Sequence, residues 1–147
     1  MERTLVILKP NAIQRELVGE LFSRFERRGL KISALKMIRI NAETAAKHYE
    51  EHRGKPFYDE LVSFITSGPS ILMVLESPGA VALVRMMVGS TDPADAASGT
   101  IRGDYATLPE HNMIHASDST TSAEREIAIF FDDSEILEYR LSVRPWL

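Results

Sequence analysis

The order in which strand-like and helix-like segments follow one another constrains this chain most. Thr4–Leu8 is an apolar, β-rich run that ends at Lys9-Pro10, which is typical of a buried central strand. Between residues 18 and 25, apolar side chains recur at positions i, i+3, i+4 and i+7, and Gly29 follows them. This spacing predicts an amphipathic helix. The chain therefore begins with a strand followed by a helix.

The remaining sequence continues the alternation. Leu30–Ile40 has apolar residues at most even positions, interrupted by Lys36, and this predicts a half-buried strand. Pro56 suits the first position of a helix, and Thr121 with Glu124 fits a capping box. The other expected elements are helices near Ala42–Glu50, Pro56–Thr66 and Gly79–Val88, strands at Ile71–Leu75 and Met113–Ala116, a loop from Gly89 to Glu110, and a last helix with Ala123, Ile127, Phe130 and Phe131 on its buried face.

The resulting order is β-α-β-α-α-β-α-loop-β-α. It matches a ferredoxin-like β-α-β-β-α-β core with helical insertions, so we expect an α+β sandwich with an antiparallel four-stranded sheet. The 147 residues are a typical length for one domain, and we expect a single domain over residues 1–147. A long loop without periodicity inside such a domain is often functional, which directs attention to residues 89–110.

Composition narrows the classes of function. The net charge is −4, so a general nucleic-acid coat is not expected, and nucleic acid is not a required partner. There are no cysteines, which excludes a disulfide framework and any thiolate metal site. No apolar run approaches the roughly 18 residues of a membrane span, and no signal-peptide pattern follows the start. We therefore expect no membrane association and a cytoplasmic location. An acidic protein that handles phosphates must concentrate its cations locally.

Polar side chains gather directly before the last helix, in Asn112-x-x-His115-x-Ser117-Asp118-Ser119. Histidine is largely neutral near pH 7, so His115 is a ready nucleophile without a separate activating base. Taken alone, however, the segment favours a purely structural role, because serine and aspartate are preferred at helix starts for local reasons. Lys9, Arg85 and Arg102 weaken that interpretation, since phosphoryl transfer depends on positioning and charge neutralisation, and guanidinium groups suit phosphate geometry.

Short segments spread over about residues 2–131 resemble the nucleoside diphosphate kinases, in the same order. The Asn-x-x-His-x-Ser-Asp-Ser segment is highly specific, and the ordered set is more so. The segments are Glu2-Arg3-Thr4-Leu5, Leu8-Lys9-Pro10-Asn11, Gln14-Arg15, Leu17-Val18-Gly19-Glu20, Arg24-Phe25-Glu26, Ala34-Leu35-Lys36, His48-Tyr49, Pro56-Phe57, Ser67-Gly68-Pro69, Gly99-Thr100-Ile101-Arg102-Gly103-Asp104 and Asn112–Ser119.

The resemblance implies a ping-pong reaction, in which a nucleoside triphosphate such as ATP gives its terminal phosphoryl group to His115 and a nucleoside diphosphate then collects it. It also implies that Phe57 stacks on the base, a contact indifferent to which base is bound. The other implied roles are sugar and phosphate binding by Lys9 and Asn112, phosphate binding by Arg85, Thr91 and Arg102, positions beside the transferring group for Tyr49 and His52, and orientation of the imidazole by Ser117 and Glu126.

The family resemblance further implies that Mg²⁺ arrives with the nucleotide, held by its phosphates, so that the protein itself supplies no metal ligand. It implies a homo-oligomer, either a tetramer or a hexamer. A few positions depart from the commonest family pattern: Asn11-Ala12 stands where Asp-Gly is usual, Ala116 where Gly is common, and Pro109 is atypical before Asn112. Pro109 bears on the geometry of its loop, and the chain from Asp132 to Leu147 lies beyond the part that carries the resemblance.

Two other functions are also compatible with parts of the sequence. His48-Tyr49-Glu50-Glu51-His52 matches H-x-x-E-H, the inverted zinc-protease signature, and two histidines four apart on one helix could share a metal. The pattern is short and the chain is small for such a protease. A non-catalytic ferredoxin-like nucleotide-binding or regulatory module would share the fold without forming a covalent intermediate. A P-loop kinase is not supported, since no Gly-x-x-x-x-Gly-Lys-[Ser/Thr] is present.

Overall fold

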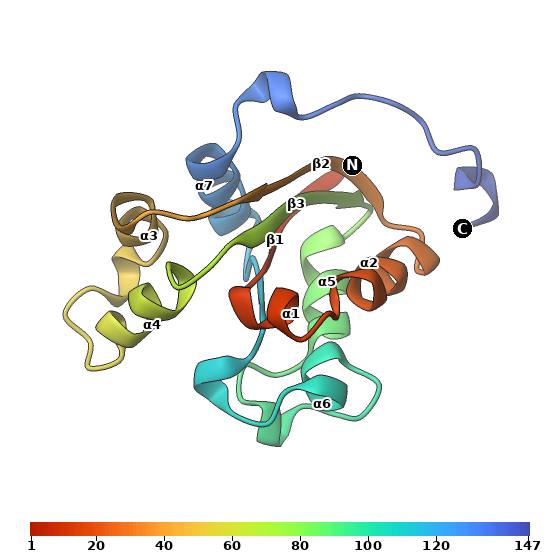
Figure 1. Ribbon diagram of the computed structural model, residues 1–147. Helices are drawn as coiled ribbons and strands as arrows, with labels where there is room; N and C mark the ends of the chain where they lie inside the picture. The colour runs from red at the N-terminus through yellow and green to blue at the C-terminus, as the bar shows by residue number, and fades with distance from the viewer.

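A four-stranded antiparallel sheet forms the centre of the computed structural model, which describes residues 1–147 (Figure 1). The strands lie in the order β2-β3-β1-β4. This order and the antiparallel pairing confirm the ferredoxin-like α+β expectation. The strands are β1 (Glu2–Leu8), β2 (Lys31–Ile38), β3 (Ser70–Ser77) and β4 (Ile114–Ala116).

Helices cover both faces of the sheet (Figure 1). The helices α2 and α5 pack on one face, and α3, α4 and α7 pack on the other. None of the helices is long and apolar enough to cross a membrane. The α-helices are α1 (Pro10–Gln14), α2 (Val18–Arg27), α3 (Ala42–His48), α4 (Tyr58–Ile65), α5 (Ala80–Val88), α6 (Ile101–Tyr105) and α7 (Thr120–Phe130), and short 3₁₀ turns are η1 (Glu50–His52), η2 (Pro93–Asp95), η3 (Pro109–His111), η4 (Asp133–Glu135) and η5 (Arg144–Trp146).

The apolar run in β1 is explained by the two helical layers. Val6 and Leu8 belong to the core beneath α2 and α5, whereas Leu5 and Ile7 belong to the core beneath α3, α4 and α7. All four side chains are fully buried. A strand covered on both faces has no solvent-facing positions, so its sequence is continuously apolar instead of alternating. At the end of β1 the backbone N–H of Lys9 donates to the carbonyl of Met113 (2.9 Å), which brings the start of β4 beside Lys9.

The edge strand β2 departs from the even-position pattern expected of it. A bulge between Ile32 and Ala34 places these residues, two apart in sequence, against opposite cores. A bulge inserts one extra residue and so reverses the alternation beyond it. Leu35 and Met37 are consequently exposed. The segment after α7 crosses this edge (Figure 1), where the Leu137 N–H donates to the carbonyl of Ser33 at 2.8 Å.

The loop expected over residues 89–110 contains η2 and the short helix α6. The helix starts at Thr100, whose hydroxyl accepts a hydrogen bond from the Gly103 N–H at 3.0 Å. A Cβ atom at Gly103 would lie 2.0 Å from the carbonyl oxygen of Ala97, so only glycine fits this close approach. Asp104 accepts from the Gly99 N–H and pairs with Arg24 at 2.6 Å, which ties the segment to α2. Side-chain contacts of this kind leave no periodic pattern.

Two expected helix starts are wrong. The helix α7 begins at Thr120, and Ser119 is the capping residue, accepting from the Ser122 N–H at 3.0 Å. Thr121 lies inside the helix, because several adjacent serines and threonines fit the local capping pattern equally well. Pro56 precedes α4, which begins at Tyr58. These shifts of one or two residues do not move the site.

Candidate active site

A cavity of about 1130 Å³ opens beside the end of β1 and receives residues from both helical layers. Its wall draws on segments distant in sequence, including Lys9 directly after β1 and residues of α3, α4, α5, β4 and α7. All seven residues predicted to bind nucleotide or react line this single cavity: Lys9, Phe57, Arg85, Thr91, Arg102, Asn112 and His115.

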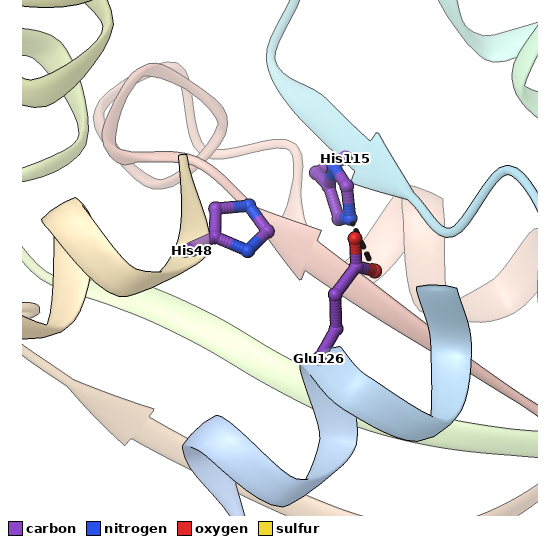
Figure 2. Close-up of side chains that lie close together, drawn as sticks. All are labelled: His48, His115 and Glu126. Carbon is purple, nitrogen blue, oxygen red and sulfur yellow. Dashed lines mark hydrogen bonds and ion pairs between the residues drawn. The ribbon is translucent and has the colours of Figure 1, made fainter. Parts of the chain in front are cut away.

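His115 stands on β4, where it pairs with Ile7 of β1. Its Nε2 lies 2.9 Å from Oε1 of Glu126 on α7, and the same oxygen accepts a hydrogen bond from the Ser117 hydroxyl at 2.6 Å (Figure 2). A carboxylate only accepts hydrogen bonds, so Nε2 carries the proton and Nδ1 keeps its lone pair. Figure 2 shows Nδ1 directed away from Glu126. The ring is thus held with its basic nitrogen available.

Glu126 is buried, and burial by itself raises the pKa of its carboxyl group. The hydrogen bond and charge of His115, and then the Ser117 hydroxyl, outweigh that effect and hold the pKa below its usual value. Glu126 is therefore ionised at neutral pH and can stabilise positive charge on the imidazole.

Three cationic side chains converge on the cavity without a carboxylate partner. Lys9 is 7% exposed and its Nζ donates to Oδ1 of Asn112 at 2.9 Å. Arg102 is 3% exposed and donates to the carbonyls of Gly89 (3.0 Å) and Ile114 (2.7 Å). Arg85 donates to the carbonyl of Ala116 at 3.2 Å.

Burial lowers the pKa values of two of these side chains. Burial lowers the pKa of Lys9 to about 7, and the nearby charge of Arg102 adds to the effect. Burial and the charge of Arg85 lower the pKa of Arg102 to about 10. Unpaired cations in a low-dielectric site are costly, and an anionic ligand relieves that cost. The geometry therefore favours a polyanion bound between these three residues and His115.

The remaining predicted residues surround this cationic end. Asn112 Nδ2 donates to the carbonyl of Thr91 at 3.4 Å, which links the loop before α6 to the segment preceding β4. Phe57 is 44% exposed at the outer end of the cavity, with its ring centroid 5.4 Å from that of His52. Tyr49 is buried, and burial followed by the charge of Glu126 raises the pKa of its hydroxyl, so this hydroxyl stays neutral.

Comparison with known proteins decides the family. The family model described as "Nucleoside diphosphate kinase" matches residues 2–136. The chain belongs to the nucleoside diphosphate kinase family. A nucleoside diphosphate kinase of Kosmotoga olearia is 57% identical over 141 residues, covering 96% of each chain. One of Thermus thermophilus is 57% identical over 137 residues, covering 93% of this chain and all of its own.

Solved structures of nucleoside diphosphate kinases have the same fold as this chain. The structure of a halophilic nucleoside diphosphate kinase from Halobacterium salinarum in complex with CDP superposes with a TM-score of 0.97 at 50% identity, over 99% of this chain and 97% of that one. A nucleoside diphosphate kinase family protein from Babesia bovis gives a TM-score of 0.96 at 42% identity, covering 99% of both chains. As a member of this kinase family, the chain is a nucleotide-binding phosphotransferase.

Among the other residues that line the nucleoside diphosphate kinase cavity, His48, Asp118 and Arg125 have no site role in the sequence-based prediction. His48 belongs to the H-x-x-E-H pattern and to a family-like segment, and its ring lies edge-on to His115 with centroids 4.6 Å apart. Asp118 was treated as a helix-capping group, and a hydrogen bond from Ser122 is the main cause that lowers its pKa. Arg125 on α7 was not singled out, and it donates to the carbonyl of Lys47 at 3.1 Å.

The zinc-protease pattern does not have the geometry that it requires. His48 ends α3, whereas His52 belongs to the separate 3₁₀ turn η1, so the two histidines do not share one helix face. His52 instead places Nδ1 3.4 Å from Nζ of Lys55.

Proposed function

We propose that this chain transfers the γ-phosphoryl group of ATP, or another nucleoside triphosphate, to a nucleoside diphosphate through a phosphohistidine on His115. One observation carries the proposal. The Nε2 atom of His115 is occupied by Glu126 at 2.9 Å, while Nδ1 is free on the side of a cavity that holds three unpaired cations. This pairs a nucleophile with a polyanion site, as phosphoryl transfer requires.

In the first half-reaction, the Nδ1 lone pair of His115 forms a bond to the γ-phosphorus. The bond from that phosphorus to the β,γ-bridging oxygen breaks, and its electron pair leaves with the nucleoside diphosphate. The imidazole becomes positively charged, and the ionised Glu126 at Nε2 stabilises that charge. In the second half-reaction, a terminal oxygen of another diphosphate attacks the same phosphorus, and the N–P electron pair returns to Nδ1.

Phosphate binding falls to the cationic end of the cavity. Arg85, Arg102 and Thr91 would hold the phosphate oxygens, and a guanidinium group can donate two parallel hydrogen bonds to such oxygens. Lys9 and Asn112 would bind the sugar and help to hold the phosphates. Their mutual hydrogen bond of 2.9 Å supports a shared role, since it fixes both side chains before the nucleotide arrives.

Base binding falls to Phe57 at the outer end. Its exposed ring offers a flat apolar face, and stacking on such a face depends weakly on which base is present. The CDP complex of the halobacterial relative supports nucleotide binding at a site of this fold. Tyr49 and His52 line the same cavity and would lie beside the transferring group.

The chemistry of the cavity also fits Mg²⁺ carried by the nucleotide. The phosphate end of the cavity presents nitrogen cations, which bind phosphate oxygens and not Mg²⁺, so the phosphates themselves would be the ligands of the ion. When bound in this way, Mg²⁺ supplies further neutralisation of phosphate charge. The protein's own groups then position the phosphorus against Nδ1 of His115.

We further propose one kinase domain over residues 1–147 that assembles as a tetramer or hexamer. The edge strand β2 carries exposed Leu35 and Met37, and Trp146 near the carboxyl end is 87% exposed. Exposed apolar side chains on a sheet edge are typical of contact surfaces between subunits. Light scattering measures the assembly: a monomer at micromolar concentration would contradict it.

A labelling experiment tests the proposed reaction. The protein is incubated with γ-labelled ATP and no acceptor. We expect the label to remain on the protein, to be lost in acid, to survive in base, and to leave when any nucleoside diphosphate is added. A binding module without catalysis takes up no covalent label. A His115→Ala variant that is labelled as fully as the parent would also reject the proposal.

A further inference from the structure

Both ring nitrogens of His48 are buried without a hydrogen-bond partner. The residue is 5% exposed at the end of α3, and its ring packs against the rings of Tyr49, His115 and Phe130. A buried polar group without a partner costs roughly 1–3 kcal/mol, and such groups call for a specific explanation. Phosphoryl transfer through His115 makes no use of these nitrogens, because Glu126 and Ser117 already complete the positioning of the imidazole.

His48 faces a set of groups that bind transition metals. It lies with His115 and Glu126 so that one ligand atom from each residue is within 4.8 Å of the other two (Figure 2). The three side chains come from α3, β4 and α7 and point toward a common centre. Two imidazoles and one carboxylate are the ligands of many three-residue zinc sites, which keep a fourth position open for water or substrate.

We propose that His48, His115 and Glu126 form a binding site for a divalent transition-metal ion of the Zn²⁺ class, and that its occupation inhibits phosphoryl transfer. Imidazole ligands favour Zn²⁺ and similar ions over Mg²⁺, which requires oxygen ligands, so this site is distinct from the Mg²⁺ that accompanies the nucleotide. It is also distinct from the H-x-x-E-H pattern, because His52 is not a member.

Metal binding exchanges one proton of His115 for the ion and requires a small movement of the three ligands. The metal takes the place of the proton on Nε2 of His115, and that proton passes to solvent. Both hydrogen bonds of the Glu126 carboxylate use Oε1, so the other oxygen can turn toward the ion. Bond lengths of about 2.0–2.2 Å to zinc separate tetrahedral ligands by about 3.3–3.5 Å. Ligand atoms that lie up to 4.8 Å apart must therefore approach one another by up to about 1.4 Å, while the His115–Glu126 contact of 2.9 Å opens slightly.

Inhibition follows from what the ion does to His115. A dication on Nε2 withdraws electron density from the ring and weakens the Nδ1 lone pair as a nucleophile. It also neutralises Glu126, which then no longer stabilises the phosphorylated imidazole. This consequence rests on the proposed role of His115 as phosphoryl acceptor, whereas metal binding itself does not.

Zinc binding is measured first on metal-stripped protein without nucleotide, by titration calorimetry with ZnCl₂. We expect one ion per chain. A His48→Phe variant keeps an aromatic ring beside Tyr49 and Phe130 but removes both nitrogens, and we expect it to bind zinc about 10- to 100-fold more weakly. His52→Phe is the matched control in the same cavity, and it should retain the parent affinity. If His48→Phe and the parent bind zinc with equal affinity, or if only His52→Phe loses zinc binding, the proposed metal site is wrong.

X-ray absorption at the zinc edge covers the case in which His48→Phe does not fold. Zinc-loaded parent protein should show two imidazole ligands at about 2.0 Å, and a spectrum without imidazole scattering rejects the site. Inhibition is then measured as phosphoenzyme formation against free zinc, which should fall with a midpoint at the calorimetric Kd. Zinc that binds as predicted but leaves phosphoenzyme formation unchanged would refute the inhibitory role, while leaving the proposed function itself intact.

Discussion

Oε1 of Glu126 accepts hydrogen bonds from both His115 Nε2, at 2.9 Å, and the Ser117 hydroxyl, at 2.6 Å. The relationship fixes the tautomer of the histidine and leaves Nδ1 as its basic nitrogen. The hydrogen bond between Glu126 and His115 also links α7 to β4 at the wall of the cavity. Most of the proposed chemistry depends on this one carboxylate, so its removal is informative.

Glu126→Gln should slow phosphoenzyme formation by about 10- to 100-fold, because the amide still accepts a hydrogen bond but no longer carries the negative charge. Rapid-quench labelling with γ-labelled ATP measures this rate. Glu124→Gln is the matched control, since Glu124 lies on the exposed face of the same helix. A rate within twofold of the parent for Glu126→Gln would show that the charge is irrelevant.

Lys9 should take up a proton when a nucleoside diphosphate binds at pH 8. Burial and Arg102 lower its pKa to about 7 in the nucleotide-free protein, so the amine is then mostly neutral. Phosphate oxygens favour the charged ammonium and raise the pKa, so binding takes up protons in the window above pH 7, and affinity falls as the pH rises through it. Calorimetry in buffers of different ionisation enthalpy measures the uptake.

At pH 6 this uptake by Lys9 should largely vanish, because the free protein is already protonated there. A Lys9→Met variant should take up fewer protons than the parent at pH 8. Proton release at pH 8, or the same uptake in Lys9→Met, would argue that another group titrates.

Arg102→Ala and Arg85→Ala should separate folding from phosphate binding. Arg102 is buried and donates to two backbone carbonyls, so its loss should lower the free energy of unfolding by about 2 kcal/mol as well as reduce kcat/KM. Arg85 is only half-buried and makes one such bond, so Arg85→Ala should reduce kcat/KM with a smaller effect on stability. Urea unfolding and steady-state kinetics measure both quantities. Unchanged kcat/KM in Arg102→Ala would assign it a structural role alone.

Phe57→Ala should weaken the binding of all nucleotides by a similar factor. Stacking on an aromatic ring is worth about 1–3 kcal/mol per base, and Phe57 offers its ring to any base at the cavity mouth. KM values for ATP, GTP and CTP in parent and variant measure the loss. A parent preference of several orders of magnitude for one base, or a variant that loses only one nucleotide, would contradict base-indifferent stacking.

Sequence patterning predicted the antiparallel four-stranded sheet, since the apolar run of β1 and the spacing of α2 express burial directly, whereas the residues that line the cavity were implied by the family resemblance. Patterning failed where side-chain contacts decide the conformation. The bulge in β2 leaves no compositional mark, and α6 is held by Thr100, Gly103 and Asp104 and not by an apolar stripe.

The neighbours of His48 within the site were also not predictable from local sequence. Its sequence neighbours match a pattern in which it could share a metal with His52, but the break between α3 and η1 separates the two, and the fold brings His115 beside it instead. Such a pairing joins positions far apart in the chain and cannot be read from local spacing. By contrast, Lys9, Arg85 and Arg102 converge as the family resemblance implied.

The position of the phosphoryl group on His115 tests the central claim most directly. The protein is phosphorylated with ATP, denatured in base and examined by ³¹P and ¹H NMR together with mapping of the labelled peptide. We predict a single phosphohistidine in the peptide that contains His115, with phosphorus on Nδ1, since Glu126 occupies Nε2. Phosphorus on Nε2, or on another residue, would contradict the account.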